Sequence, residues 1–181
     1  LILAFAAALL WLLPRGLGLR SWACLVLAGF VFYRPERLDD GLARITVMDA
    51  GQGLSVWVQT RDRNLLFDTG TAQAAQTGIV PSLNAMGVRR LDKLILSHHD
   101  SDHDGGLDAV SDIEIGETLA GQPEFYPNAK FCAEAQWQWD GVDFELLRSS
   151  ENPGGEDNDR SCVLRVVSDG QALLVTGDLG V

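Results

Sequence analysis

Basic side chains are scarce in this chain. Its 181 residues hold 14 lysines and arginines against 25 acids, which gives a formal net charge of −11. The deficit lies after residue 37, where 24 acids face 10 basic residues and the net charge is −14. Sequence-independent binding of nucleic acid normally rests on lysine and arginine contacts to phosphate. This charge balance argues against a large basic patch as the main feature of residues 38–181.

Repeats and cysteines are also few. The chain has no internal repeat and no low-complexity tract, which excludes a repeat architecture. It has three cysteines, Cys24, Cys132 and Cys162. Cys132 and Cys162 could pair in an oxidising compartment. Because Cys162 stands in an apolar run, a buried thiol is the simpler prediction.

Charged residues are almost missing from residues 1–33, which form two hydrophobic segments joined by "PRGLGLR". A bilayer span needs about 20 apolar residues. We predict that residues 1–37 are transmembrane helical segments from a larger membrane domain, so that the chain is a fragment. A buried helical hairpin of a soluble protein is the alternative. Arg15 and Arg20 predict a cytoplasmic joining loop, which places residues 38–181 on the outer side of the membrane.

Short apolar runs closed by Gly, Asp, Asn or Ser dominate residues 38–181 and predict strands. They are "RITVMDAGQG", "LSVWVQT", "RNLLFDTG", "LDKLILS", "VDFELL", "SCVLRVVS" and "ALLVTGD". Residues 78–87 and 105–113 are compact helical candidates between them, and Gly87 suits the residue that follows a helix end. Alternation of strands and helices predicts an α/β fold.

All three histidines of the chain fall in the stretch "LSHHDSDHDGG", as His98, His99 and His103. Aspartates alternate with them, and imidazole with carboxylate is a common ligand set for zinc, manganese and iron. A solvated acidic loop with incidental histidines is the bland alternative. Three histidines scattered at random would rarely give this spacing, so we predict a metal-binding loop.

Acids also end other predicted strands. Asp49 precedes "AGQG", Asp68 precedes "TG", and Asp178 follows "LLVTG". Taken singly, each is more often a turn-forming residue. Taken together with the histidine run, they match the way in which α/β folds build sites at the carboxyl ends of strands.

Calcium is a rival for the same loop, because Asp100, Asp102, Asp104 and Gly105 spell the first half of an EF-hand-like loop. The second half fails, since the position that needs a bidentate Glu holds Ser111. The loop also follows a predicted strand where an EF-hand has a helix. We therefore favour a transition-metal or magnesium site.

The motif of His98, Asp100, Asp102 and His103 resembles the H-x-[HD]-x-D-H motif of the metallo-β-lactamase fold, in the variant found in ComEC-type DNA internalisation proteins. "DAGQGLSVWVQT…NLLFDTG", "CAEAQWQWDGVDFELL", "NDRSCVLRV" and "LLVTGDLG" resemble further blocks of that family in the same order. The resemblance implies an αββα sandwich over residues 38–181 whose last part, after Val181, is absent. It also fits hydrophobic segments directly upstream.

The resemblance further implies a ligand set. His98 and Asp100 would contribute to a first metal ion, Asp102 and His103 to a second, and Asp178 would bridge the two. Asp68 would orient the loop and its ligands, and His99 and Asp104 would be outer or exposed residues.

One position departs from the wider fold. No histidine follows His103, so the late ligand position falls to Asn158 or Asp159. Asn is a weaker ligand than imidazole, and an oxygen-rich set suits Mn²⁺ or Mg²⁺ better than Zn²⁺.

The function implied by the resemblance is a membrane-tethered, two-metal nuclease that degrades one DNA strand while the other crosses the inner membrane. Asp102 and Asp68 are then the candidate catalytic carboxylates. The implied partners are DNA, the membrane, the rest of the channel-forming polypeptide and other competence proteins. The alternative is a non-catalytic collar or strand guide of the same fold.

Trp137 and Trp139 alternate in "WQWD" and should share one face of a strand. Bases can stack on such rings. Packing in the core or on a sheet face is the favoured prediction.

Overall fold

The structure is a computed structural model that describes residues 23–24, 27–28, 37–147 and 157–179. The chain divides into two compact units, Leu1–Arg37 and Leu38–Val181. The predicted transmembrane pair, residues 1–33, lies almost wholly outside the described residues. Among those that are described, no helix has both the length and the apolar character to cross a bilayer.

A six-stranded sheet forms the centre of the second unit, in the order β1-β2-β3-β5-β7-β8. The first three strands pair antiparallel, and β3, β5, β7 and β8 run parallel. The strands are β1 Arg44–Val47, β2 Val56–Gln59, β3 Asn64–Phe67, β5 Lys93–Leu96, β7 Thr118–Ala120 and β8 Lys130–Phe131. Because parallel strands end at the same edge of a sheet, the loops after β3, β5 and β7 meet there.

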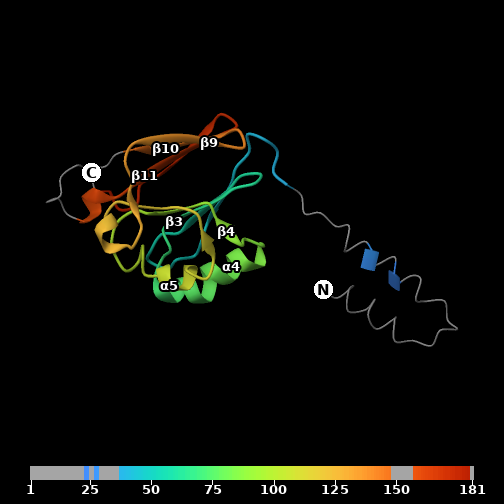
Figure 1. Cartoon of the computed structure of the whole chain (residues 1–181), viewed down its shortest axis with the longest axis horizontal. Coiled ribbons are helices and arrows are strands. Elements are labelled where there is room, and N and C mark those ends of the chain that lie inside the picture. The colour runs from blue at the N-terminus through green and yellow to red at the C-terminus, as the bar shows by residue number, and fades with distance from the viewer. Residues whose placement is uncertain (1–22, 25–26, 29–36, 148–156, 180–181) are drawn as a thin grey trace. The chain divides into compact units, whose positions relative to one another are not determined.

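A second, four-stranded sheet is antiparallel throughout, in the order β12-β11-β10-β9. Its strands are β9 Ala135–Trp139, β10 Val142–Leu147, β11 Val163–Ser168 and β12 Gln171–Val175. A small parallel pair, β4 Arg90–Leu91 and β6 Glu114–Ile115, forms a third sheet. Figure 1 labels β9, β10 and β11 above β3, so the two sheets form separate layers.

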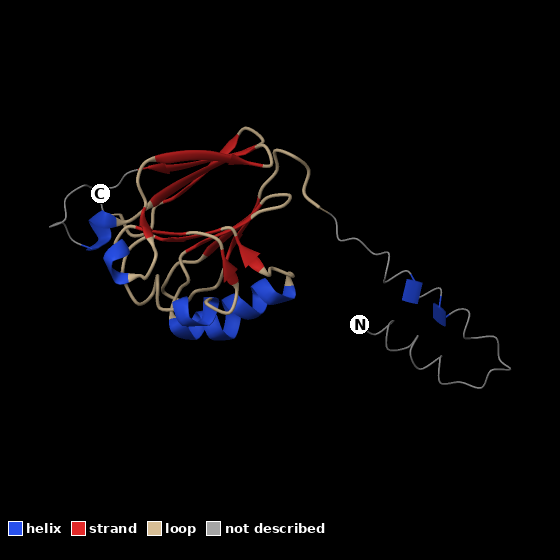
Figure 2. Ribbon diagram, in the orientation of Figure 1, coloured by secondary structure: helices blue, strands red, loops and turns tan. Residues whose placement is uncertain are grey.

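Helices cover the face of the six-stranded sheet that points away from the second sheet (Figure 2). They are α3 Ala72–Ala74, the π-helical turn η2 Ala75–Ile79, α4 Val80–Ala85 and α5 Leu107–Val110, with the 3-10 turns η3 Pro123–Phe125 and η4 Asp157–Arg160 elsewhere. The helix predicted over 78–87 is therefore confirmed as α4. Gly87 follows its end with a φ of +81°, the left-handed conformation that glycine adopts readily.

Two apolar cores hold the layers together. Phe67 and Ile95 of the six-stranded sheet meet Phe144 and Val166 of the four-stranded sheet, all almost fully buried. On the other face, Leu66 and Leu94 pack against the helical layer. Alternate residues of β3 and β5 thus point to opposite cores, as the two-residue period of a strand requires.

The layers are helix, sheet and sheet, which confirms the α/β expectation. The predicted αββα sandwich has one more helical layer. Within residues 37–147 and 157–179, no helix covers the outer face of the four-stranded sheet (Figure 2), and Leu174 on that sheet is 52% exposed.

The tryptophan pair packs as the favoured prediction stated. The ring of Trp137 stacks on Phe144 at 5.2 Å between centroids, and Trp139 meets the same ring at 5.2 Å. Both tryptophans pack against the core between the sheets. They are therefore part of the interface between the sheets.

The cysteine prediction was wrong. Cys162 is not a free thiol but is joined to Cys132 by a disulfide, with the two Cα atoms 6.0 Å apart. Cys132 follows β8 and Cys162 precedes β11, so the bridge ties the edge of one sheet to the other. The burial expected for Cys162 is observed, and the pairing with Cys132 that the sequence left as the alternative is the one that forms.

Candidate metal centre

The histidine loop leaves the carboxyl end of β5, between the loops that follow β3 and β7. Ser97 and His98 come directly after β5, and Asp68 comes directly after β3. Asp178 approaches from the four-stranded sheet, three residues after β12 ends at Val175. The candidate site therefore forms where the two sheets meet at one edge.

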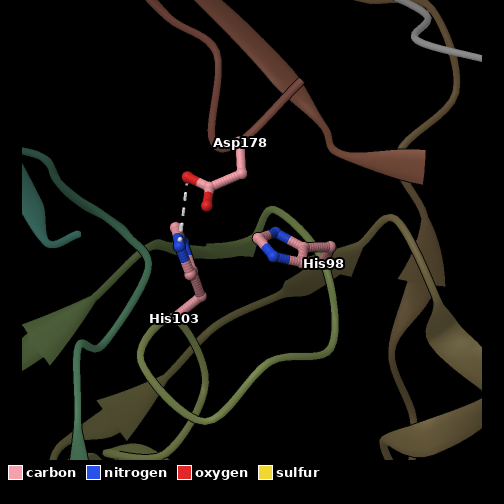
Figure 3. Close-up of side chains that lie close together, drawn as sticks. All are labelled: His98, His103 and Asp178. Atoms are coloured by element: carbon pink, nitrogen blue, oxygen red, sulfur yellow. Dashed lines mark ion pairs between the residues drawn. The ribbon is translucent and has the colours of Figure 1, made fainter. Parts of the chain in front are cut away.

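Three of the predicted ligands converge there. Ligand atoms of His98, His103 and Asp178 all lie within 4.8 Å of one another. His103 Nε2 is 3.2 Å from Asp178 Oδ1, and the two imidazole centroids are 4.3 Å apart. Figure 3 shows the two rings below the carboxylate, which reaches down from the loop after β12. Asp178 and His103 thus lie close enough to share a cation, and metal binding by them stays a prediction.

Asp68 anchors the interior side of the site. It is fully buried and adopts a φ of +57°, a left-handed conformation that aspartate tolerates better than most residues. The backbone N–H of Ser97 donates to Asp68 Oδ1 at 2.6 Å. The Ser97 hydroxyl and His103 Nδ1 both donate to Oδ2, at 2.7 and 2.8 Å. Asp68 thereby turns His103 so that Nε2 points toward Asp178.

Ser97 also orients the ring of His98. A hydroxyl has one proton to donate, and that of Ser97 is committed to Asp68. Its oxygen lies 3.0 Å from His98 Nδ1, so the ring nitrogen is the donor in that contact. Ser161 Oγ, also fully buried, lies 3.3 Å from the same nitrogen. His98 therefore carries its proton on Nδ1 and keeps the lone pair of Nε2.

That Nε2 atom tests whether a metal fits. It is buried and has no hydrogen-bond partner, whereas nearly all buried polar atoms in folded proteins have one. It belongs to the same three-residue group as the His103 and Asp178 side chains. Two imidazole nitrogens and a carboxylate oxygen are ligands that divalent transition metals accept. The donor set fits a divalent cation.

The pKa shifts of the two histidines differ in sign. Burial, and then the proximity of His103, lower the pKa of His98, so this ring is neutral and ready to bind a cation. Burial also acts to lower the pKa of His103, but the hydrogen bond and charge of Asp68 outweigh it and raise the pKa overall. The pKa of Asp68 is itself raised by burial, against the effect of its three donors.

The other predicted ligands lie at or beyond the margin of this group. Asp102 Oδ1 is 4.0 Å from His103 Nε2. Asp100 is exposed, and its Oδ1 accepts a 2.6 Å hydrogen bond from the Ser101 N–H. Asn158 and Asp159 are exposed in η4, and the carbonyl of Asn158 accepts from Ser161 N. Direct ligation by these four side chains stays a prediction.

Two glycines of the predicted blocks explain how the segments come so close. A Cβ on Gly53 would lie 1.7 Å from the carbonyl oxygen of Asp102, so the "GQG" element can pack on the histidine loop only as glycine. A Cβ on Gly177, whose φ is +56°, would lie 2.7 Å from Ser97 Cβ. The residue before Asp178 must therefore be small for Asp178 to reach the site.

On the outer side of the loop, the surroundings of Asp104 do not favour the calcium alternative. Asp104 is almost buried, and its Oδ2 accepts a hydrogen bond from the Tyr126 hydroxyl at 2.6 Å and contacts His99 Nδ1. Its side chain is thus used within the protein. His99 is exposed, as expected, whereas Asp104 ties the loop to the segment after β7.

Ser97 and Ser161 are the functional residues that the sequence did not single out. Ser97 stood next to the histidine run, which was a usable signal. Ser161 lies 63 residues from His98 in sequence, and nothing local indicates their contact.

Comparisons with known proteins agree with this geometry. The family model of the metallo-beta-lactamase superfamily matches residues 48–181. The chain is 70% identical over 179 residues to Competence protein ComA of Neisseria gonorrhoeae, covering 99% of this chain and 26% of that protein. It is 31% identical over 164 residues to Recombination protein 2 of Haemophilus influenzae, covering 85% of this chain and 20% of that protein. The chain thus spans about a quarter of these relatives or less, and the resemblance to ComEC-type competence proteins is confirmed.

A solved structure supports the fold alone. A metallo-beta-lactamase with a HARLDQ motif from Cronobacter sakazakii superposes with a TM-score of 0.55 at 19% identity, covering 70% of this chain and 53% of that one.

Proposed function

Because the chain belongs to the metallo-beta-lactamase superfamily, we propose that residues 38–181 are a metal-dependent hydrolase that cleaves the phosphodiester bonds of DNA. The observation that carries the proposal is the buried, unpartnered Nε2 of His98, grouped with His103 and Asp178. An unpaired buried nitrogen is unfavourable in a metal-free fold. It is explained if a cation is its partner.

The proposed ligand set is the one implied by the motif. His98 and Asp100 would hold a first ion and Asp102 and His103 a second. Asp178 would be shared by both, and Asn158 would complete the first set. Mn²⁺ or Zn²⁺ is the proposed metal, and Mg²⁺ fits the oxygen ligands. When bound, two such ions supply an activated water and neutralise charge on a scissile phosphate.

The residues of the chain itself orient and hold these groups. Asp68 fixes the His103 ring through Nδ1, and Ser97 fixes the His98 ring. Hydrogen bonds of this kind set which nitrogen faces a metal and raise its basicity. Asp102, 4.0 Å from His103 Nε2, is the proposed catalytic carboxylate. Asp68 is the proposed positioning acid behind it.

DNA as substrate rests on relatives rather than on charge. A competence protein is 70% identical over 179 residues, and the resemblance to ComEC-type proteins implies degradation of one DNA strand during uptake. We accordingly propose that the hydrolase is tethered to the inner membrane and faces the periplasm. Its proposed partners are the rest of the channel-forming polypeptide and other competence proteins. Reporter fusions after residue 40 should be active on the periplasmic side, and activity only in the cytoplasm would overturn this topology.

A non-catalytic collar or strand guide is the second candidate. The observation that favours it is the oxygen-poor core of the site, because Asp100 and Asp102 lie outside the three-residue group. The −14 charge of residues 38–181 also disfavours tight contact with a polyanion. A collar of this kind needs the fold but no reaction.

Asp102→Asn separates the two candidates. The full-length protein is incubated with single- and double-stranded DNA and Mn²⁺, Zn²⁺ or Mg²⁺. A hydrolase should lose most cleavage in Asp102→Asn, about tenfold for each 1.4 kcal/mol of lost transition-state stabilisation, while circular dichroism shows an unchanged fold. Asp112→Asn, an exposed acid outside the site, is the matched control. Wild-type cleavage rates in Asp102→Asn would refute the mechanism. Intact DNA uptake in Asp102→Asn cells would favour the collar.

A further inference from the structure

An exposed pair of stacked rings lies beside the candidate metal centre. The His99 ring stacks on Phe125 with centroids 4.1 Å apart and planes tilted by 19°. The His99 side chain is 46% exposed and Phe125 is 51% exposed. His99 is the residue next to His98, so their Cα atoms are about 3.8 Å apart. The stack is therefore at the edge of the site.

Buried polar groups hold these exposed rings in place. The side-chain oxygen of Gln122, itself 1% exposed, accepts a 2.6 Å hydrogen bond from the backbone N–H of His99. Asp104 accepts from Tyr126 and contacts His99 Nδ1. Part-buried hydrogen bonds thus join the histidine loop to the residues that flank η3. Hydrogen bonds to neighbouring residues therefore fix the position of the His99 ring at the surface.

Charge around the stack is unsuited to phosphate. Asp100 and Glu124, the sequence neighbours of His99 and Phe125, are both exposed acids. Arg160 is paired with Glu124 at 2.7 Å, and its side chain is only 19% exposed. The surroundings of the stack are therefore unsuited to phosphate contacts through basic side chains. Its accessible feature is a flat aromatic face.

We propose that His99 and Phe125 form a stacking platform for a base of single-stranded DNA next to the metal centre. The proposal rests on the proposed hydrolase and names how it holds its substrate. A base is planar and uncharged, so it can stack on these rings where the acids would repel phosphate. Every base has such a face, which makes the contact independent of sequence. The platform also explains how an acidic domain could retain a nucleic acid.

A protein partner is the less favoured occupant. Stable protein interfaces bury about 800 Å² on each side, whereas two half-exposed rings among acids offer far less apolar surface. A single base matches the size of the exposed pair. Failure of DNA to bind while a protein does would count for that alternative.

The test measures DNA binding by the full-length protein. The fluorescence anisotropy of a labelled single-stranded oligothymidine reports binding, both without added metal and with Mn²⁺. Phe125→Ala should weaken binding about 5- to 150-fold, the range expected for loss of one stacked base. Phe125→Trp should restore it. Phe131→Ala is the matched control, because Phe131 is a 42% exposed phenylalanine on β8 outside the platform.

Two further readouts separate stacking from a structural role. An oligonucleotide with abasic positions should bind wild type weakly and should not distinguish it from Phe125→Ala. The slope of log affinity against log salt should be the same in both proteins, since no phosphate contact is removed. Equal affinity of Phe125→Ala and Phe131→Ala, or an abasic effect that persists in Phe125→Ala, would overturn the platform.

The outcome is distinct from that of the hydrolase test. Cleavage by wild type with no effect of Phe125→Ala on KM would remove the platform and leave the hydrolase. Base-dependent binding without cleavage in the presence of any of the metals would support the platform and remove the hydrolase.

Discussion

Two histidine–aspartate pairs on one short loop have very different surroundings. In the inner pair, His103 Nδ1 meets Asp68 at 2.8 Å, and the side chains are 2% and 0% exposed. In the outer pair, His99 Nδ1 meets Asp104 at 2.5 Å, and the exposures are 46% and 8%. Each aspartate turns its histidine, but burial decides what the ring then offers. The inner ring directs its Nε2 atom toward Asp178. The outer ring is exposed to solvent.

The difference also affects energy. A buried ion pair is costly to form, and removal of one partner leaves a polar group without compensation. A surface pair exchanges its partner for water at little cost. The inner pair should therefore govern both folding and metal binding, and the outer pair should govern neither.

The largest expected effect comes from the inner carboxylate. Asp68→Asn keeps the shape and the left-handed backbone conformation, but it removes the charge that accepts from Ser97 and His103. We expect a loss of about 3–5 kcal/mol in the free energy of unfolding, measured by urea denaturation of the metal-free protein. The matched change, Asp104→Asn, should cost about 1 kcal/mol or less, because His99 is exposed and the new amide oxygen can still accept from the Tyr126 hydroxyl. Equal losses would break the comparison.

The disulfide is expected to come next. It closes a 30-residue separation between the two sheets, and the N–H of Cys162 donates to the carbonyl of Ser97 behind the inner pair. The double variant Cys132→Ala with Cys162→Ala should lose about 2–4 kcal/mol of stability, measured in the same denaturation series. Cys24→Ala serves as control, since Cys24 is exposed and unpaired. No loss in the double variant would show that the bridge is dispensable.

A smaller effect should follow from Ser97. Ser97→Ala removes the oxygen that accepts from His98 Nδ1, and loss of such a contact typically lowers metal affinity about 10- to 100-fold. Ser161→Ala removes only the longer 3.3 Å contact and should lower it less. Calorimetric titration with Mn²⁺ measures both, and the ¹⁵N shifts of the His98 ring report its tautomer. An unchanged His98 tautomer in Ser97→Ala would contradict the assigned orientation.

The smallest effect is a shift with pH. An ordinary histidine has a pKa of about 6.5. The pKa of His103 is raised above that value, so this ring keeps its proton to higher pH. A metal must displace that proton, so affinity should fall as pH drops through the raised pKa, by about tenfold per pH unit. The lowered pKa of His98 adds no competition in that range.

Asp68→Asn sharpens this test. Without the carboxylate that raises the pKa of His103, the loss of metal affinity should begin at a lower pH. Mn²⁺ titrations between roughly pH 6 and pH 8 compare the two proteins. If affinity fell at the same pH in both, Asp68 would not be the cause of the shift.

Much of the fold followed from local patterns. Runs such as "VDFELL" and "SCVLRVVS" alternate or concentrate apolar residues as strands do, and they became β10 and β11. The short strands β6, β7 and β8 were missed. With two or three residues each, they are too short to show a period, and they are set by pairing with neighbours.

The candidate site followed from sequence in part. The spacing of His98 and His103 indicated a metal loop because that information is local. Asp178 was placed by resemblance, and the structure brings it within 3.2 Å of His103. Ser161 and the Phe125 ring were not anticipated, since each reaches the loop only through a contact distant in sequence.

The sequence by itself determined which ligand types are present and that one loop carries all three histidines. Local spacing and strand endings are enough for that. The tertiary structure alone decided that His98 and His103 turn inward while His99 turns outward, and that Cys132 and Cys162 are partners. These outcomes depend on the carboxylates, hydroxyls and strands that pack around each residue from far along the chain. Burial is a property of the assembled layers, and no short stretch of sequence contains it.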